Sequence, residues 1–416
     1  MIKIISNYWA LFSGLFLLLV GNGLQGSLLG IRSQMEGFSP LLSGIIMSAY
    51  FAGFLVGVFW ASSLIRRVGH IRVFAAMASI ASAAILLMGL WISPVGWFLL
   101  RFVIGVSFAA VYVVVESWIN SQATNESRGQ LLSVYTIVTV VGALGGQAFL
   151  NVASPSTIIL FVVASILVSI GLIPLLLTAA PAPPFEQKSD VTLVDIFRAS
   201  PVGFMGTLFS GFLIGSYLSY SPVFAADQGL STINISLFMA AIFVAGGLTP
   251  WPLGRMSDYM DRRLMIAIMM AVTTFLCWGA AQAYHWQVIG TVTMLGFYVL
   301  AASTAFSLYG ISIAYTNDNL APEQMVGASA ILLLVNAAGA ILGPIGSSVF
   351  QTVLGPSGPL IFIGCCTFML LVFVLYRMNV REAPPLEDRT IFSPNPVRGT
   401  VVVTSMVQEN AMEREA

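Results

Sequence analysis

The stretch Gly254-Arg255-Met256-Ser257-Asp258-Tyr259-Met260-Asp261-Arg262-Arg263 is the densest charge cluster in a chain of which only 8% of the residues are charged. Long apolar runs flank it on both sides. Charged side chains at this density are not accommodated in hydrocarbon, so we expect a tight turn at a membrane surface. Three of the charges are arginines, which favours the cytoplasmic side of that membrane.

The composition of the whole chain points to a membrane protein. The 416 residues are 58% hydrophobic with a mean hydropathy of +0.92, whereas soluble domains are about 45–50% apolar. The formal net charge is zero, so nothing suggests a nucleic-acid partner. The three cysteines all lie in apolar runs and the two histidines are far apart. We therefore expect no disulfide, no metal site and no cofactor.

Apolar runs long enough to cross a hydrocarbon core of about 30 Å recur along almost the whole sequence. They predict twelve spans, at about 7–30, 40–63, 72–93, 96–120, 129–152, 156–178, 202–226, 231–254, 263–284, 286–315, 325–352 and 357–377. Of the 17 lysines and arginines, only Arg32 and Arg101 fall on the outer side when the N-terminus is placed inside. This asymmetry predicts an even number of spans, with both termini in the cytoplasm.

The turn at Gly254–Arg263 and the fourth span resemble the major facilitator superfamily. The pattern Gly-x-x-x-Asp-x-x-x-Arg-Arg is similar to the loop signature of that family, although Asp261 stands where the family has glycine. A weaker copy, Ser62 to Arg72, keeps Gly69 but has Arg66 at the aspartate position and His70 at the first arginine position. In span 4, Arg101, Gly105 and Ala109 match the family's Arg-x-x-x-Gly-x-x-x-Ala pattern. The Glu-Ser-Trp ending of that span resembles a poorly characterised group of small bacterial members.

The resemblance implies an all-α polytopic membrane protein with twelve transmembrane helices in two pseudo-symmetric six-helix bundles. We expect an N-terminal bundle over 1–178 and a C-terminal bundle over 202–377. A cytoplasmic linker with a short amphipathic helix occupies 179–201, and a mostly disordered cytoplasmic tail occupies 378–416.

Glu116 is the one acid well inside a span, and two interpretations of it remain open. In the first, it lies near the cytoplasmic end of span 4 and pairs with Arg66, Arg67 or Arg128 to latch an inner gate. In the second, it is a proton-coupling group that titrates during transport. In the other half we expect Asp258 to cap the start of span 11, with Arg262 and Arg263 completing an inner gate.

Several polar side chains inside the spans are candidates for substrate binding. Asn22 and Gln25 share a face of span 1, and Tyr217 and Tyr220 share a face of span 7; the alternative for both pairs is helix packing. The resemblance places Arg101 in the central cavity, the alternative being an arginine that snorkels to the outer edge. Tyr112, Asn336 and Gln147 are further candidates.

Together these features predict a secondary active transporter in a bacterial cytoplasmic (inner) membrane, working as a monomer by alternating access. We expect a small organic solute, neutral or singly charged, and coupling to protons. Gly142–Gly146 partly resembles a motif of superfamily antiporters and favours export. The alternatives are an uncoupled uniporter or a non-transporting assembly factor with the same fold. No nucleotide loop, catalytic triad or acid cluster supports an enzyme.

Overall fold

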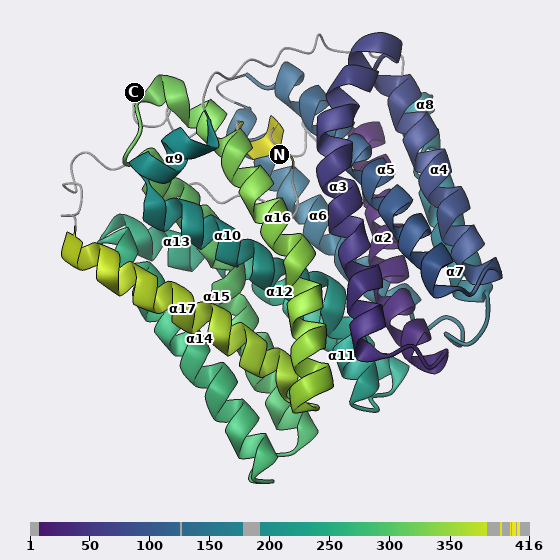
Figure 1. Cartoon of the computed structure of the whole chain (residues 1–416). Coiled ribbons are helices and arrows are strands. Elements are labelled where there is room, and N and C mark those ends of the chain that lie inside the picture. The colour runs from purple at the N-terminus through teal and green to yellow at the C-terminus, as the bar shows by residue number, and fades with distance from the viewer. Residues whose placement is uncertain are drawn as a thin grey trace. The chain divides into compact units, whose positions relative to one another are not determined.

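The computed structural model describes residues 8–124, 127–177 and 192–380, together with 392, 400, 402–404, 406 and 407 (Figure 1). Twelve of its helical segments are long and apolar enough to cross a membrane, which confirms the predicted number of spans. Contacts divide the chain into two compact units. Unit 1 draws on Met1–Gln187, Ser219–Phe243 and Arg398–Val403, and unit 2 on Lys188–Leu218, Val244–Val397 and Thr404–Ala416.

Unit 1 contains the first six spans. Its helices are α2 (Trp9–Met35), α3 (Pro40–Val68), α4 (His70–Leu90), α5 (Pro94–Gln122), α6 (Arg128–Phe149), α7 (Ile159–Ile170), α8 (Ile173–Leu176), α11 (Ser221–Asp227) and most of α12 (Thr232–Leu248). Helices α3 and α5 both begin with a proline preceded by a serine that accepts a backbone N–H, a combination that favours a helix start. The sixth span, expected as one helix, is interrupted between α7 and α8.

Unit 2 contains the remaining helices. They are α9 (Leu193–Ala199), α10 (Pro201–Gly215), the first part of the π-helix η1 (Ser216–Tyr220), the end of α12, α13 (Pro250–Asp258), α14 (Arg262–His285), α15 (Thr291–Asn317), α16 (Pro322–Leu354) and α17 (Gly358–Val380). Pro250 separates α12 from α13 inside the eighth span. The π-helix carries Tyr217 and Tyr220, and such segments are frequent at functional sites.

Ser219–Phe243, which the sequence placed in the second bundle, clusters with unit 1. Two contacts explain this. The hydroxyl of Ser219 donates to the carbonyl of Met47 at 3.1 Å. A Cβ on Gly30 would lie 2.6 Å from the Cβ of Pro222, so α11 packs directly against α2. The first part of the seventh span therefore belongs to unit 2 and the second part to unit 1, and the change falls within the π-helix.

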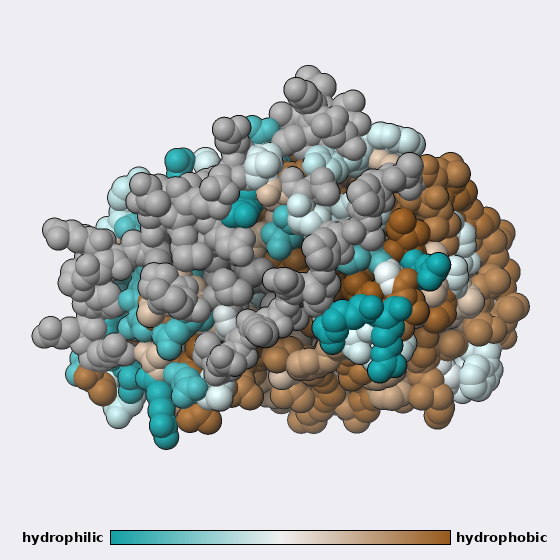
Figure 2. All heavy atoms as spheres, turned by 90° about the horizontal axis from the view of Figure 1, so that it is seen from above, coloured by the Kyte–Doolittle hydropathy of each residue, from teal (hydrophilic) through white to brown (hydrophobic). Residues whose placement is uncertain are grey.

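Close packing of α3 against α5 positions the polar residues of unit 1. A Cβ on Gly105 would lie 2.1 Å from the carbonyl oxygen of Tyr50, so only glycine permits this approach. Large apolar side chains on the opposite faces remain exposed, among them Phe59 and Trp60 on α3 and Leu87 and Leu90 on α4. Figure 2 shows the hydrophobic colouring gathered on the flank where α3 and α4 lie. Such a surface is suited to lipid.

Seven positions of the C-terminal tail are described, and they differ from the expected disorder. Phe392, Thr400, Val403, Thr404, Met406 and Val407 are buried, and residues 402–404 and 406–407 are helical. The only signal of this in the tail sequence is the short apolar run Val401-Val402-Val403, and it does not identify the distant helices that the buried positions contact. The remainder of the tail lies outside the described residues.

Candidate functional site

A polar cluster around Arg101 lies in the interior of unit 1. Only 4% of the Arg101 surface is exposed. Its Nη1 donates to the Oε1 of Gln25, and its guanidinium carbon lies 4.7 Å from the centre of the Tyr50 ring. The Nδ2 of Asn22 donates to the hydroxyl of Tyr50 at 3.3 Å. Helices α2, α3 and α5 thus bring four polar side chains together, and Arg101 does not snorkel to the outer edge.

Asn22 and Gln25 do share a helix face, as their spacing predicts, and both reach this cluster. Tyr50 was missed. It lies in an apolar run, and nothing in its neighbourhood along the chain links it to Arg101. The link depends on the close approach of α3 and α5 described above. Tyr112, also on α5, is fully buried, and its ring meets the ring of Phe54 edge-on at 5.9 Å.

The candidates on span 7 are separated. Tyr217 lies in unit 2, where its ring packs edge-on against Tyr298 at 4.6 Å and near Phe306 at 6.2 Å. Its buried hydroxyl has no hydrogen-bond partner among the described residues. Tyr220 is fully buried and belongs to unit 1. The two tyrosines therefore contribute to different units, although three positions apart on one helix would place them on one face.

Asn336 and Gln147 hold helices together. The Nδ2 of Asn336 donates to the carbonyl of Thr207 at 3.2 Å, joining α16 to α10. The Oε1 of Gln147 accepts from Ser27 at 2.8 Å and its Nε2 donates to the carbonyl of Gly23 at 3.3 Å, joining α6 to α2. These amides make the interhelical hydrogen bonds that polar side chains commonly form inside membrane bundles.

Glu116 is completely buried near the C-terminal end of α5. The hydroxyl of Tyr135 on α6 donates to its Oε1 at 2.6 Å. The backbone N–H of Thr400 donates to Oε2 at 2.9 Å, the Thr400 hydroxyl donates to the same oxygen, and the N–H of Val403 lies 3.3 Å from it. All of these donors are neutral.

No arginine is among the hydrogen-bond partners of Glu116 within the described part of the chain. The side chains of Arg66 and Arg67 are exposed, and Arg128 is half-buried. The ion pair that the first interpretation requires is therefore not formed in this structure. Thr400 was missed as a partner because it lies 284 positions from Glu116 in the sequence.

The turn at Gly254–Arg263 of unit 2 is built from ion pairs. Arg262, at the start of α14, lies with its Nη2 3.1 Å from the Oδ1 of Asp258 and its Nε 3.3 Å from the Oδ2 of Asp318. The side chains of Arg262 and Asp318 are each only 1% exposed. The sequence singled out Asp258 and Arg262 but not Asp318, which follows α15 directly.

The predicted cap by Asp258 at the start of α16 is not formed among the described residues, because the hydrogen-bond partners of its carboxylate are Arg262 and Phe392. The Oδ1 of Asp258 instead accepts the backbone N–H of Phe392 at 2.9 Å. Arg263 pairs with Asp261, whose Oδ2 lies 2.8 Å from its Nη2. Asp261 also accepts the N–H of Arg263 at 2.9 Å and so caps α14 itself.

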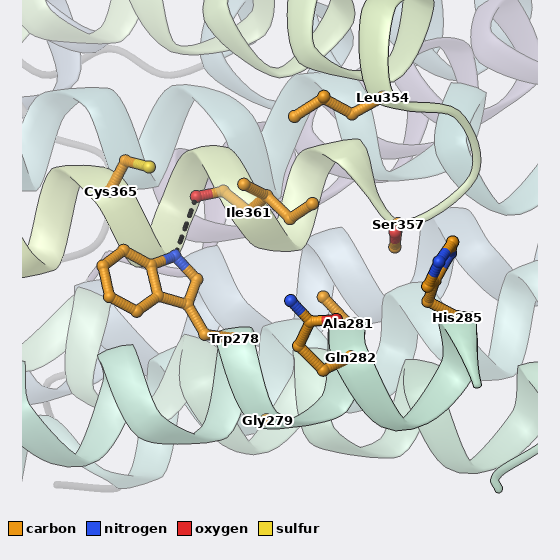
Figure 3. A pocket seen from close by; sticks show the side chains of 9 residues that line it. All are labelled: Trp278, Gly279, Ala281, Gln282, His285, Leu354, Ser357, Ile361 and Cys365. Atoms are coloured by element: carbon orange, nitrogen blue, oxygen red, sulfur yellow. Dashed lines mark hydrogen bonds between the residues drawn. The ribbon is translucent and has the colours of Figure 1, made fainter.

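A separate cavity of about 620 Å³ lies in unit 2 between α14 and α17 (Figure 3). It is lined by Trp278, Gly279, Ala281, Gln282, His285, Leu354, Ser357, Ile361 and Cys365. The indole N–H of Trp278 donates to the carbonyl of Ile361 at 3.3 Å and bridges the two helices. None of the candidate site residues lines this cavity.

Similar proteins share both sequence and fold with this chain. Two uncharacterised transporters of the major facilitator type called YcaD, from Escherichia fergusonii and Shigella flexneri, are each 28% identical over 90% of this chain and 96% of their own length. Among solved structures, a bacterial homologue of the human lysosomal transporter Spinster superposes with a TM-score of 0.73 at 16% identity, over 94% of this chain and 99% of its own. The D-xylose–proton symporter gives 0.69 at 15% identity, over 91% and 98%.

The family model described as Major Facilitator Superfamily matches residues 11–344 and 204–407, which together cover nearly the whole chain. The match takes in the Arg101 cluster, Glu116 and the turns at Ser62–Arg72 and Gly254–Arg263. The sequence relatives and structural neighbours named above are transporters. The chain therefore belongs to the major facilitator superfamily and is a multi-pass membrane transporter of that family.

Proposed function

We propose that this protein is a proton-coupled transporter of a small organic solute, and that Glu116 is the group whose protonation couples the two fluxes. The observation that carries the proposal is the complete burial of this carboxyl inside a span, among neutral donors. An ionisable group at membrane depth is expensive to maintain and is commonly part of an ion or proton pathway. The D-xylose–proton symporter, which shares the fold, is by its name coupled to protons.

The Arg101 cluster is the proposed substrate-binding region of unit 1. It offers one cation, two amides and a phenol within mutual reach, a set suited to orienting a small polar solute. A single fixed cation favours a substrate that is neutral or carries one negative charge. In unit 2, the buried hydroxyl of Tyr217 and the rings around it form a second group that a substrate could contact.

Transport by this fold would proceed by alternating access, in which the two halves move relative to one another about the substrate. We propose a location in the cytoplasmic membrane with both termini inside, an orientation that the distribution of lysine and arginine favours. A monomer is proposed from the family resemblance. Export is the proposed direction, on the resemblance of Gly142–Gly146 to the antiporter motif.

The test is proton movement across liposomes containing the purified protein, with a panel of small drugs, amino acids, sugars and nucleosides as candidate substrates. The wild type is compared with Glu116→Gln, which preserves size and an acceptor oxygen but cannot ionise. The matched control is Arg198→Gln, at an exposed cation of α9 that belongs to no candidate site. We expect a substrate-triggered proton signal in the wild type and the control, and its loss in Glu116→Gln.

Other outcomes distinguish the alternatives. A proton signal that survives in Glu116→Gln would place the coupling group elsewhere. Substrate movement without any proton signal in the wild type would show a uniporter. If no compound of the panel produces a proton signal or substrate movement, and a stoichiometric protein partner co-purifies, the assembly factor is favoured.

A further inference from the structure

The C-terminal tail supplies most of the donors that surround Glu116. Thr400 contributes its backbone N–H and its hydroxyl, and Val403 contributes a second N–H. Thr400 is itself completely buried. Tyr135 is the partner of Glu116 that belongs to a span. The last span ends at Val380, so the covering residues come from a segment that follows the transmembrane helices.

The same tail has a second anchor, which lies in unit 2. The N–H of Phe392 donates to Asp258, and the Phe392 ring is buried. The ring lies where glycines leave room: a Cβ on Gly254 would lie 2.0 Å from the ring's Cε1, and one on Gly310 would lie 3.0 Å from its Cε2. Gly254 is the first glycine of the loop signature. The tail thus contacts the two acids that the sequence had associated with the inner gate.

Both anchors use backbone N–H groups as donors to carboxylates. These contacts form no covalent bond and no ion pair, and water can replace each donor when the segment leaves. A segment bound in this way is displaceable. While it stays, however, the carboxyl of Glu116 is enclosed and its acceptor sites are taken.

We propose that the C-terminal segment around Thr400 is an internal ligand of Glu116 that inhibits transport, and that it must leave before Glu116 can exchange a proton. The inference rests on the proposed role of Glu116. It assigns the tail a regulatory function: any cytoplasmic factor that binds the tail would activate the transporter.

The first experiment measures access to Glu116 directly and needs no substrate. Dicyclohexylcarbodiimide enters apolar sites and adds to a protonated carboxyl, whose proton passes to a carbodiimide nitrogen while the carboxylate oxygen bonds to the central carbon. The adduct rearranges to a stable acylurea, which peptide mass spectrometry locates. The rate at Glu116 is compared in the full-length protein, in Thr400→Val, and in a chain lacking residues 398–416.

We expect modification to be about tenfold faster in Thr400→Val, because the variant loses a hydrogen bond to an ionisable group, and faster still in the shortened chain. Phe392→Ala, which acts away from Glu116, should also accelerate it. The matched control is Thr404→Val, at another buried threonine of the tail whose hydroxyl is not a partner of Glu116, and it should leave the rate unchanged. All variants are first compared for monodispersity. Equal rates in the wild type, Thr400→Val and the shortened chain would overturn the proposal.

The second experiment repeats the liposome assay with the shortened chain. The proposal expects a larger substrate-triggered proton signal than in the full-length protein. A fast carbodiimide reaction with an unchanged or smaller transport signal would show that the tail covers Glu116 without inhibiting. If neither chain moves protons while the carbodiimide result holds, the proposed function fails and the docking of the tail stands.

Discussion

The turns at Ser62–Arg72 in unit 1 and Gly254–Arg263 in unit 2 occupy corresponding places in the two halves of the sequence, but their chemistry differs. In unit 2, the helix after the turn begins with Arg262, whose guanidinium lies between Asp258 and Asp318. In unit 1, the helix after the turn begins with His70, whose Nε2 lies 3.1 Å from the hydroxyl of Ser117 on α5. Unit 2 therefore joins its helices with fixed opposite charges, whereas unit 1 uses a hydrogen bond between side chains with no acid.

This difference bears on Glu116. The side chain of Asp318 in unit 2 is buried beside the permanent cation of Arg262. Glu116 of unit 1 is buried next to Ser117, and its hydrogen bonds come from neutral groups. Of these two acids, Glu116 is the one that we propose to change its charge in a transport cycle. The two units thus differ in whether a buried acid is paired with a permanent cation.

The largest effect is expected from Arg262→Met, which leaves Asp318 buried without its cation. Removing one partner of a buried ion pair destabilises by about 3–5 kcal/mol. The measurement is thermal unfolding of the purified protein in detergent, followed by tryptophan fluorescence. The double variant Arg262→Met with Asp318→Leu should recover much of the loss, since both charges are then gone. A double variant no more stable than the single one would show that the ion pair is not what joins α14 to α15.

Gly69→Asp is expected to have the next largest effect, because it gives the turn of unit 1 the residue found in unit 2. Gly69 has φ 89° and ψ 160°, a region of backbone conformation that is restricted to glycine. A side chain there costs about 1–3 kcal/mol. Unfolding should therefore occur at a lower temperature than in the wild type. Gly69→Ala serves as the control that separates backbone strain from the added charge, and the two variants should be similar. An unchanged unfolding temperature in both would mean that the turn can rearrange.

The sequence was sufficient for the spans but not for these turns. Hydropathy is a local property, so twelve spans could be predicted without knowing how they pack, and only breaks such as that before Pro250 were missed. The partners of the buried acids could not be predicted in the same way. Asp318 and Thr400 have ordinary neighbours along the chain, and their roles arise from contacts with helices far away in the sequence. Glu116 and Arg101 could be singled out because an ionisable group in an apolar run is conspicuous by itself.

His70→Phe should have a smaller effect than Gly69→Asp. The substitution keeps a ring in a buried position but removes the hydrogen bond to Ser117. One neutral hydrogen bond contributes about 0.5–1.5 kcal/mol, so the loss should be well below that of Arg262→Met in the same unfolding assay. Ser117→Ala, which removes the other partner, is the matched comparison. A loss of stability as large as that of Arg262→Met would mean that the hydrogen bond stabilises unit 1 as strongly as the ion pair stabilises unit 2.

The smallest effect is expected from Asp261→Gly, which restores the family's residue in the turn of unit 2. At first sight Asp261 is a defect in the signature, but its φ of −59° does not require glycine, and its carboxylate caps α14 and pairs with Arg263. Exchanging a capping aspartate for glycine costs only a few tenths of a kcal/mol, and a partly exposed ion pair adds about 0–1 kcal/mol. The unfolding temperature should fall slightly, and high salt should narrow the gap to the wild type because it screens the ion pair. A rise in the unfolding temperature would mean that the two turns share one backbone requirement for glycine, and the structural difference between them would no longer explain why one copy keeps its glycine and the other does not.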